Sequence, residues 1–520
     1  MTVAMAMASP NIRRSLSEIP SQILATISSI TSLLQILNPQ HPNHPLNPNP
    51  SILNHFSPHI NRHFVIRVIQ NQQNPYHALF FFNWASNPNP NPTNYSHTHF
   101  SYIAITDLLI SRNLFSLATE LLESNNKLSD FMVGRLIKAH GDLGHIRWAL
   151  HLFDRVRTRY SGRCLFSYNA ILGVLVRGNR VDLAEIFFDE MMSQGIVKPD
   201  VSTCTVMIKG FCKIGMIEKA QKLFDEMPVR PNLLTYNTIV NGLCKKGLME
   251  AALEVVERMK ETQDCLPDTV TYTILIDGYC KIKDLEDAQK CFDVMVSRNL
   301  EPNELTYNTL INGFCVCGDV DGAKRMMTKM RLNGLKDTIT THTSLLRGYC
   351  IAGRSDEAFQ HFKDLIGRRG MKPDAKSYQV LVNEFCKLHK PYDAIDLLRE
   401  MKGYGIRPPV SSFNKVFRVL VELDQADRAT VVLNQMAQMG CKPNFLSYNA
   451  VICGIVRSKG RMKVVEGLLK EMVRNGLEPD ATMYSCLVQG YWDDGNEEMA
   501  KQVSQEMMDK GFVLKKLVNV

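Results

Sequence analysis

Hydrophobic residues recur at three- and four-residue steps along most of the chain, in stretches of about a dozen residues. Residues 269–303 show the arrangement, in which "VTYTILIDGYCKI" is followed by "LEDAQKCFDVMVSR". This spacing predicts two amphipathic helices. A Pro-Asp or Pro-Asn pair follows in most cases. Proline stops one helix, and the Asp or Asn side chain caps the next. The predicted element is therefore helix, short turn, helix and a loop that ends in proline.

This element repeats with a period of about 35 residues. One small residue of the second predicted helix marks the register, at Ala118, Ala149, Ala184, Ala220, Ala252, Ala288, Ala323, Ala358, Ala394, Ala429, Val465 and Ala500. The resulting units are 99–129, 130–164, 165–200, 201–232, 233–268, 269–303, 304–338, 339–374, 375–409, 410–444, 445–480 and 481–515. Neither helix can bury its apolar face alone, so neighbouring units must stack. We predict an all-α fold, an α-solenoid of about 10–12 helix-turn-helix repeats.

The first 98 residues differ from the repeats, with four arginines and Glu18 as the one acidic residue. Residues 1–38 are acid-poor and contain Arg and Ser, which is typical of an organelle transit peptide; an untargeted tail is the alternative. Arg13 and Arg14 favour the mitochondrion, with the chloroplast second. Residues 39–98 are rich in Asn and Pro and are expected to be loop, apart from a short helical region at 63–86. Residues 99–164 are two degenerate repeats, 165–515 are ten good ones, and 516–520 are a short tail.

Composition and charge narrow the classes of partner. The formal net charge is +8 and is spread thinly over 520 residues, so affinity for nucleic acid would need an arranged stripe of charge. The most apolar window, Ile23 to Leu37, is interrupted by Ser, Thr and Gln, and no membrane span is predicted.

Six of the fourteen cysteines occupy the twelfth place of their units: Cys212, Cys244, Cys280, Cys315, Cys350 and Cys386. Equivalent places lie one repeat apart in space, which excludes disulfides and a shared metal ion and predicts small packing residues. No phosphate-binding loop, nucleophile motif or acid/base pair occurs in the sequence. We therefore expect no metal, no cofactor and no enzymatic activity.

The repeated lines "TYNTIVNGLCKKG" (235–247), "TYTILIDGYCKIK" (271–283) and "TYNTLINGFCVCG" (306–318) resemble the pentatricopeptide repeat family. The resemblance is clear over 165–515 and weak over 99–164. It implies a right-handed superhelix and a pure-repeat (P-class) plant organellar protein that binds single-stranded RNA as a monomer. Such a protein would act in transcript stabilisation, processing, splicing or translation, alone or with other RNA-processing proteins. The chain ends at "KKLVNV", so we expect neither a deaminase-like nor a nuclease domain.

The resemblance also implies that the fifth and the last residue of each unit read one base together. A last Asp only accepts hydrogen bonds and suits uracil and guanine, whereas a last Asn also donates and suits adenine and cytosine; a fifth Thr favours purines and a fifth Asn pyrimidines. The predicted readers are Asn169 with Asp200 (U), Thr205 with Asn232 (A), Asn237 with Asp268 (U), Thr273 with Asn303 (A), Asn308 with Thr338 (pyrimidine), Thr343 with Asp374 (G), Asn414 with Asn444 (C or U) and Asn449 with Asp480 (U). Gln379 with Pro409 fits no base, nor do the first two units and the last. The predicted target core is 5′-UAUAYGNYU-3′.

Two further sets complete the predicted site. Apolar residues at the second place should flank the bases: Phe166, Leu234, Val270, Leu305 and Leu446. Basic residues at the thirteenth place should face phosphates: Arg177, Lys213, Lys245, Lys281, Lys387 and Arg457. Two simpler interpretations stay open, namely that the reader positions are only helix caps and that the basic residues only stabilise helix ends. The alternative function is a protein-binding solenoid without RNA specificity.

Overall fold

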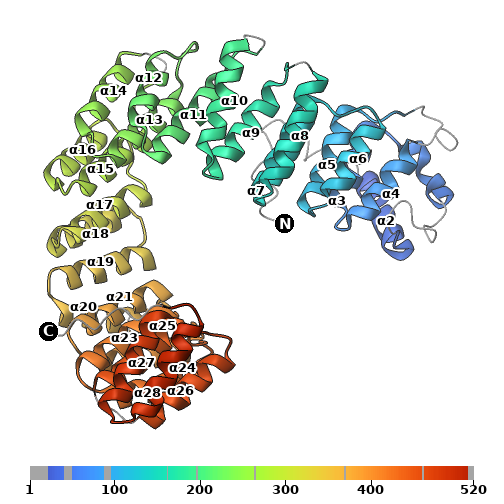
Figure 1. Cartoon of the computed structure of the whole chain (residues 1–520). Helices are drawn as coiled ribbons and strands as arrows, with labels where there is room; N and C mark the ends of the chain where they lie inside the picture. Colours follow the sequence, from blue (N-terminus) through green and yellow to red (C-terminus); the bar gives the residue numbers. More distant parts are fainter. Residues whose placement is uncertain are drawn as a thin grey trace. The chain divides into compact units, whose positions relative to one another are not determined.

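The computed structural model describes residues 21–39, 50–86, 95–160, 162–194, 197–262, 265–367, 370–458 and 462–512, and the regular structure in these ranges is helical. The chain forms two compact units, Met1–Gly242 and Leu243–Val520, and their boundary falls within helix α13 (Leu233–Lys245). Figure 1 shows the helices of each unit in chain order. Over the described ranges, no helix has both the length and the apolar character needed to cross a membrane.

The first unit begins with four elements that precede the repeats: α2 (Ser21–Leu37), the 3-10 helix η1 (Pro50–His59), α3 (Arg62–Asn71) and α4 (Pro75–Ala85). Four helix pairs and most of α13 follow: α5 (His99–Ser111) with α6 (Phe115–Ser124), α7 (Asp130–Asp142) with α8 (Ile146–Arg159), α9 (Leu165–Arg177) with α10 (Val181–Gln194), and α11 (Val201–Ile214) with α12 (Ile217–Asp225).

The second unit contains the end of α13, then α14 (Met249–Glu261) and seven further pairs. These are α15 (Thr269–Lys281) with α16 (Leu285–Ser297), α17 (Glu304–Val316) with α18 (Val320–Leu332), α19 (Ile339–Ile351) with α20 (Ser355–Gly367), α21 (Ala375–Lys387) with α22 (Pro391–Gly403), α23 (Val410–Glu422) with α24 (Ala426–Gln438), α25 (Phe445–Arg457) with α26 (Met462–Arg474), and α27 (Ala481–Asp493) with α28 (Glu497–Asp509).

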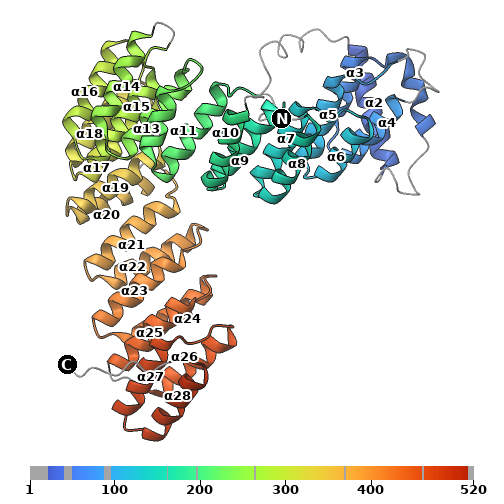
Figure 2. The ribbon, with the colours of Figure 1, turned by 45° about the horizontal axis from the view of Figure 1, so that its top comes forward.

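Stacking of helix pairs is the same in both units. In α15 to α28, each first helix contacts its own second helix and the first helix of the next pair. The row α5, α7, α9 and α11 is built in the same way in the first unit, and Figure 2 shows successive pairs side by side within each unit. The predicted all-α solenoid of helix-turn-helix repeats is therefore confirmed.

Glycine at the tenth place explains how closely the first helices pack. A Cβ atom added to Gly313 in α17 would lie 2.1 Å from Cys280 Sγ of α15, and one added to Gly348 in α19 would lie 2.9 Å from Cys315 Cβ of α17. Only a residue without a side chain fits there, although glycine inside a helix costs about 1 kcal/mol relative to alanine. The twelfth-place cysteines are the residues that fill this contact.

The cysteine thiols are consistent with that packing role. None of the fourteen, all of which lie in the described ranges, forms a disulfide, and Cys244, Cys280, Cys315 and Cys386 are buried. Burial raises the pKa of the Cys280 and Cys315 thiols to about 12, so both remain protonated at neutral pH and are poor nucleophiles.

Aromatic pairs join the second helix of one repeat to the first helix of the next. Tyr307 is 1% exposed and lies edge-on to Phe292, with 5.3 Å between ring centroids. Tyr378 is fully buried and meets Phe362 at 5.0 Å in the same way. Such pairs contribute about 0.5–1.5 kcal/mol beyond the area they bury. Tyrosine at the fourth place is therefore a stacking residue between repeats.

The structure contains two helical segments before the helical region expected at 63–86. Residues 21–37, expected to belong to a transit peptide, form α2, which packs on α3 and buries Ile30 and Leu34 completely. Pro50–His59, expected to be loop, form η1, whose Asn54 side chain accepts a hydrogen bond from Trp84 Nε1 at 3.2 Å. Apolar residues at helical spacing within the Asn- and Pro-rich region supply the buried surface that the composition alone does not suggest. Residues 1–20 and 513–520 lie outside the described ranges.

Candidate nucleic-acid interface

The last residue of a repeat caps the first helix of the next repeat. Asp374, for example, precedes α21 in an extended conformation, and its carboxylate accepts the Ser377 backbone N–H at 2.8 Å. The same bond is made by Asp200, Asn232, Asp268, Asn303, Asn444 and Asp480. These last residues are therefore helix caps, and capping fixes where each side chain lies.

Capping also brings some of these last residues beside the fifth residue of their own repeat, and Asp200 is an example. Asn169 lies on α9 and Asp200 caps the neighbouring helix α11, so the Asn169 amide donates to Asp200 Oδ1 and Oδ2 at 3.2 and 3.3 Å. Burial alone would raise the pKa of Asp200, but bonds from the Thr203 backbone, the Thr203 hydroxyl and Asn169 outweigh it and lower the pKa. Asp200 is therefore an ionised, acceptor-only group at neutral pH.

Five more predicted pairs are joined through a hydroxyl, which belongs to the third residue of the next repeat. Thr306 Oγ1, for instance, lies 2.8 Å from Thr273 Oγ1 and donates to Asn303 Oδ1 at 3.1 Å. Equivalent bridges link Thr205 to Asn232 through Thr235, Asn308 to Thr338 through Thr341, Thr343 to Asp374 through Ser377, and Asn414 to Asn444 through Ser447. The structure thus brings six of the eight predicted pairs together.

The other two pairs differ. Asn237 lies in the first compact unit and Asp268 in the second. Asn449 Oδ1 lies 3.3 Å from the Cys453 thiol, while Asp480 accepts the Met483 backbone N–H at 2.8 Å. Met483 stands at the third place, where other repeats have Thr or Ser, so no hydroxyl bridges this pair.

Close packing explains why residues 130–164 carry no reader pair. The fifth residue is Gly134, and a Cβ added to it would lie 3.0 Å from the backbone oxygen of Phe166 on α9. The last residue, Cys164, makes no side-chain cap, and Asp130 of α7 accepts the Phe166 and Ser167 backbone N–H groups at 2.9 Å instead. This junction therefore lacks a polar reader pair, and the Phe166 backbone leaves little room for a side chain at residue 134.

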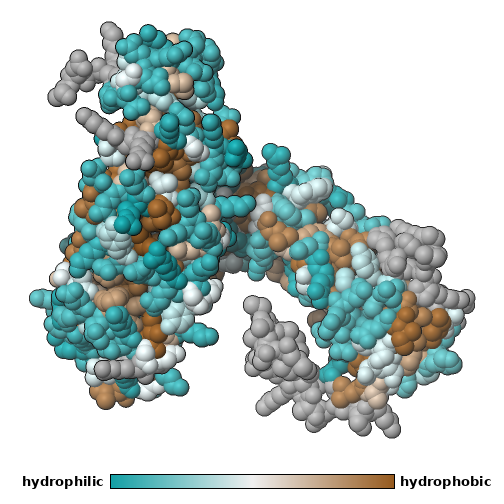
Figure 3. All heavy atoms as spheres, turned by 90° about the horizontal axis from the view of Figure 1, so that it is seen from below, coloured by the Kyte–Doolittle hydropathy of each residue, from teal (hydrophilic) through white to brown (hydrophobic). Residues whose placement is uncertain are grey.

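The second-place residues form an exposed apolar series. Exposed fractions are 57% for Phe166, 65% for Leu234, 51% for Val270, 66% for Leu305 and 59% for Leu446. Phe100 and Phe131 hold the same place in the degenerate repeats and are 52% and 37% exposed, although sequence reasoning omitted them. Their position as the second residue of units 99–129 and 130–164 was sufficient to identify them from the sequence. On the face shown in Figure 3, hydrophobic residues lie in small groups among hydrophilic ones.

The thirteenth-place basic residues are all exposed, and several have partners within the protein. Lys213 Nζ donates to the Val176 and Arg177 carbonyl oxygens at the end of α9, at 3.0 and 3.1 Å. Arg177 pairs with Asp142, Lys281 with Asp277 and Lys387 with Glu384; no partner is seen for Lys245 or Arg457 among the described residues. The ion pairs of Arg177 and Lys281 are exposed and worth little, so phosphates can compete for these two cations.

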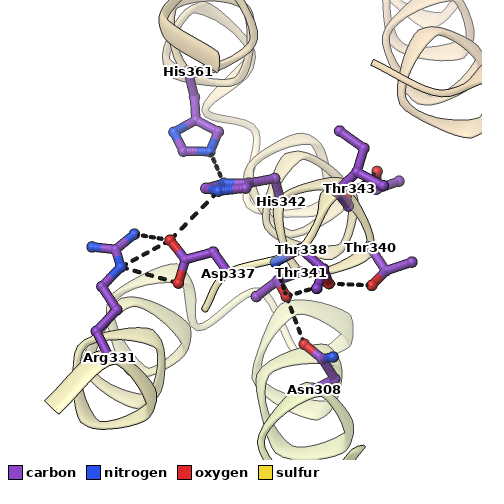
Figure 4. A network of polar contacts seen from close by, with 10 residues as sticks. Asn308, Arg331, Asp337, Thr338, Thr340, Thr341, His342, Thr343 and His361 are labelled. Atoms are coloured by element: carbon purple, nitrogen blue, oxygen red, sulfur yellow. Dashed lines mark hydrogen bonds and ion pairs between the residues drawn. The ribbon is translucent and has the colours of Figure 1, made fainter. Parts of the chain in front are cut away.

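One pair is supported by an additional polar network (Figure 4). His342 takes the fourth place, where tyrosine usually stands, and its fully buried ring lies 3.1 Å from His361 Nε2 and 3.6 Å from Asp337 Oδ2. Asp337, directly before Thr338, also accepts from Arg331 Nε at 2.8 Å. These contacts anchor the chain immediately before the last residue of the repeat.

Three family descriptions match the chain. The profile described as PPR repeat family matches residues 163–213, 199–230, 231–281, 267–316, 305–351, 337–387 and 444–493. Pentatricopeptide repeat domain matches 396–457, and PPR repeat matches 376–406 and 482–512. The chain belongs to the pentatricopeptide repeat family.

Relatives of this pentatricopeptide repeat protein occur in Arabidopsis thaliana. The small ribosomal subunit protein mS79 (rPPR3b) is 32% identical over 123 residues, which are 23% of this chain and 31% of that protein. A chloroplastic pentatricopeptide repeat-containing protein is 29% identical over 183 residues (33% and 25%), and a mitochondrial one is 27% identical over 170 residues (32% and 31%). The matches span a third or less of the length of these relatives.

Solved structures that are similar to this chain include the pentatricopeptide repeat protein PPR10 from maize. It is 19% identical, with a TM-score of 0.41 and coverage of 96% of this chain and 95% of that chain. Yeast Rmd9p in complex with a 16-nucleotide target RNA is 12% identical, with a TM-score of 0.42 and 85% coverage of both chains.

Proposed function

We propose that this pentatricopeptide repeat protein binds single-stranded RNA and selects bases along it. The observation that carries this proposal is the repeated joining of the fifth and last side chains, in a row that also exposes an apolar second-place residue. A base held between successive second-place side chains would present its edge to one such pair. Exposed apolar residues and polar pairs at one fixed register are what single-strand binding with base reading requires.

The proposed target core is 5′-UAUAYGNYU-3′. Asp200 illustrates the chemistry, because its ionised carboxylate accepts hydrogen bonds and therefore favours the ring N–H of uracil or guanine over adenine or cytosine. Thr343 with Asp374 would read guanine, and Thr273 with Asn303 adenine. Gln379 with Pro409 stays unassigned.

The proposed mode of action is occupancy of the RNA without chemistry. A bound solenoid would shield a transcript from exonucleases, hold it unfolded, or present it to other RNA-processing proteins, with this chain acting as a monomer. Within the described ranges, no group of three or more His, Cys, Asp or Glu side chains is placed to hold a metal ion.

The proposed location is an organelle, supported by relatives whose names include mitochondrial and chloroplastic proteins. Arg13 and Arg14 favour the mitochondrion, with the chloroplast as the alternative. Because α2 is packed into the fold, a removable leader would end before Ser21 rather than at residue 38.

The direct test is binding of the full chain to RNA containing UAUAUGAUU, compared with the same bases in scrambled order. We expect the target to bind at least about tenfold more tightly, a difference of about 1.4 kcal/mol, and binding to weaken as salt rises because phosphate contacts release counterions. Fluorescence anisotropy at several stated salt concentrations measures both. Equal affinity for the two RNAs would overturn base selectivity, and no affinity for either would favour a protein-binding solenoid.

Leu305 tests the apolar series separately. Leu305→Ala should weaken target binding by about threefold to tenfold, because an aliphatic platform contributes less than the 1–3 kcal/mol of an aromatic one. The side chain is 66% exposed, so thermal stability should change little. Leu332→Ala is the matched control, since Leu332 is 80% exposed at the end of the second helix of the same repeat. Equal effects of the two substitutions on RNA binding would contradict the assigned role.

A further inference from the structure

The third place of the repeats carries a buried hydroxyl that no base-reading assignment includes. Thr203, Thr235, Thr306, Ser377 and Ser447 are each 0% exposed, and Thr341 is 1% exposed. Each of these six hydroxyls lies within hydrogen-bond distance of both the fifth and the last residue of the preceding repeat. Six fully buried hydroxyls in one register, all directed at the two predicted readers, indicate a role beyond filling space.

The hydroxyl sets the orientation of a fifth-place asparagine. Oγ1 of Thr203 donates to Asn169 Oδ1 at 2.6 Å, and Ser447 donates to Asn414 Oδ1 at 2.7 Å. With the oxygen held in this way, Nδ2 lies 3.2 Å from the last residue for Asn169 to Asp200 and 3.4 Å for Asn414 to Asn444. At Asn308, whose Oδ1 accepts from Thr341 at 2.7 Å, Nδ2 instead lies 3.5 Å from Glu304 Oε1. An amide has two N–H groups, so one remains for a base.

Two exceptions show what the hydroxyl depends on. After the unassigned pair Gln379 and Pro409, the third-place Ser412 Oγ is buried and has no hydrogen-bond partner among the described residues. After the pair Asn449 and Asp480, the third place is Met483, which cannot donate a hydrogen bond. The bridge therefore needs both a polar reader pair and a third-place hydroxyl.

We propose that the third-place hydroxyl is a positioning residue for base reading by the preceding repeat. This inference rests on the proposed RNA-binding function. The hydroxyl holds the oxygen of the fifth-place amide and also lies 2.8 Å from the last residue, as from Thr203 Oγ1 to Asp200 Oδ1. The backbone N–H of the third-place residue holds the last residue whether or not a hydroxyl is present. That N–H lies 2.8 Å from Asp200 Oδ1 in one repeat and 2.8 Å from Asp480 Oδ1 in the other.

The backbone N–H and the hydroxyl are expected to affect different base choices. Selection of uracil over cytosine depends on the aspartate, which keeps its backbone anchor in both repeats. Selection of uracil over guanine depends on the asparagine, which is anchored at Asn169 and lacks a hydroxyl anchor at Asn449. The chain therefore contains its own comparison, in which the first and ninth bases are read by the same residue types with and without the hydroxyl.

The experiment uses reciprocal variants of the full chain. Thr203→Val removes the hydroxyl at nearly constant volume and keeps the N–H, whereas Met483→Thr adds a hydroxyl at the second site. Affinities are measured for the UAUAUGAUU target and for RNAs with G or C at the first or the ninth base. Thr203→Ser is the control that keeps the hydroxyl.

We expect Thr203→Val to reduce uracil-over-guanine discrimination at the first base about fivefold, the equivalent of one hydrogen bond of about 1 kcal/mol. Discrimination at the ninth base should not change, and Thr203→Ser should behave as the unmodified chain. Met483→Thr should raise uracil-over-guanine discrimination at the ninth base about threefold or more. A purely structural hydroxyl would change affinity for all RNAs equally and leave these ratios unaltered, which would overturn the proposal. Failure of the unmodified chain to prefer its target would instead overturn the proposed function.

Discussion

Replacing Thr273 with Asn and Asn303 with Asp should change the preferred fourth base of the bound RNA from adenine to uracil. The pair would then match Asn169 with Asp200, which the same protein already accommodates beside a third-place threonine. Thr306 supplies that hydroxyl here, 2.8 Å from the position-273 side chain. The double variant should lose the contact to the edge of adenine and gain one to the edge of uracil. The ratio of its affinities for RNA with uracil and with adenine at the fourth base should therefore rise by at least about tenfold, or 1.4 kcal/mol.

The single variants sharpen this test, because each creates another predicted pair. Asn303→Asp alone would leave Thr with Asp, the pair that Thr343 and Asp374 form, and should favour guanine. Thr273→Asn alone would give Asn with Asn, as at Asn414 and Asn444, and should favour pyrimidines. Equilibrium binding to four RNAs that differ only at the fourth base measures all three outcomes. A persistent preference for adenine in the double variant would refute the assignment of these two residues.

Gly313→Ala should destabilise the second unit by about 1–3 kcal/mol, the usual effect of overpacking a close helix contact. The added Cβ would lie 2.1 Å from Cys280 Sγ and 2.7 Å from Cys280 Cβ, so α15 and α17 would have to separate. Circular dichroism during urea unfolding, together with hydrogen exchange of α15 and α17, measures the loss locally, which matters because repeat arrays need not unfold in one step.

Gly467→Ala is the matched control in the same unit. Gly467 lies inside α26, and an added Cβ there meets no atom within 4 Å. This change should stabilise the helix by up to about 1 kcal/mol. Adding Cys280→Ala to Gly313→Ala removes the nearest atom and should restore part of the lost stability. If Gly313→Ala and Gly467→Ala behaved alike, the close contact would not be what requires glycine.

The fold was predictable from sequence because its signals are local and repeated. The pattern in residues 269–303 predicted two helices, and α15 and α16 occupy Thr269–Lys281 and Leu285–Ser297. The N-terminal region was less predictable. Ile30 and Leu34 lie four positions apart on one face of α2, and both are buried. The helix on which α2 packs, α3, comes later in the sequence, so local spacing alone does not show that this face is covered.

The candidate site was predictable in part. The reader residues could be located by register, and whether they select bases remains a proposal. Their hydrogen-bonding partners could not be located, because Thr203 belongs to the next repeat and meets Asn169 only after α9 and α11 pack together. The absence of a reader at Gly134 likewise depends on how near the Phe166 backbone lies.

The sequence by itself determined the repeat unit, the helix boundaries and the places at which a polar pair recurs. Hydrophobic periodicity, proline and capping residues act within a few positions of one another, so they can be recognised from the sequence alone. The tertiary structure alone decided which residues of neighbouring repeats touch. It placed glycine against cysteine, the third-place hydroxyl between two readers, and one face of α2 against α3. Each of these contacts joins positions about thirty or more residues apart, or depends on a distance between helices that no local signal specifies.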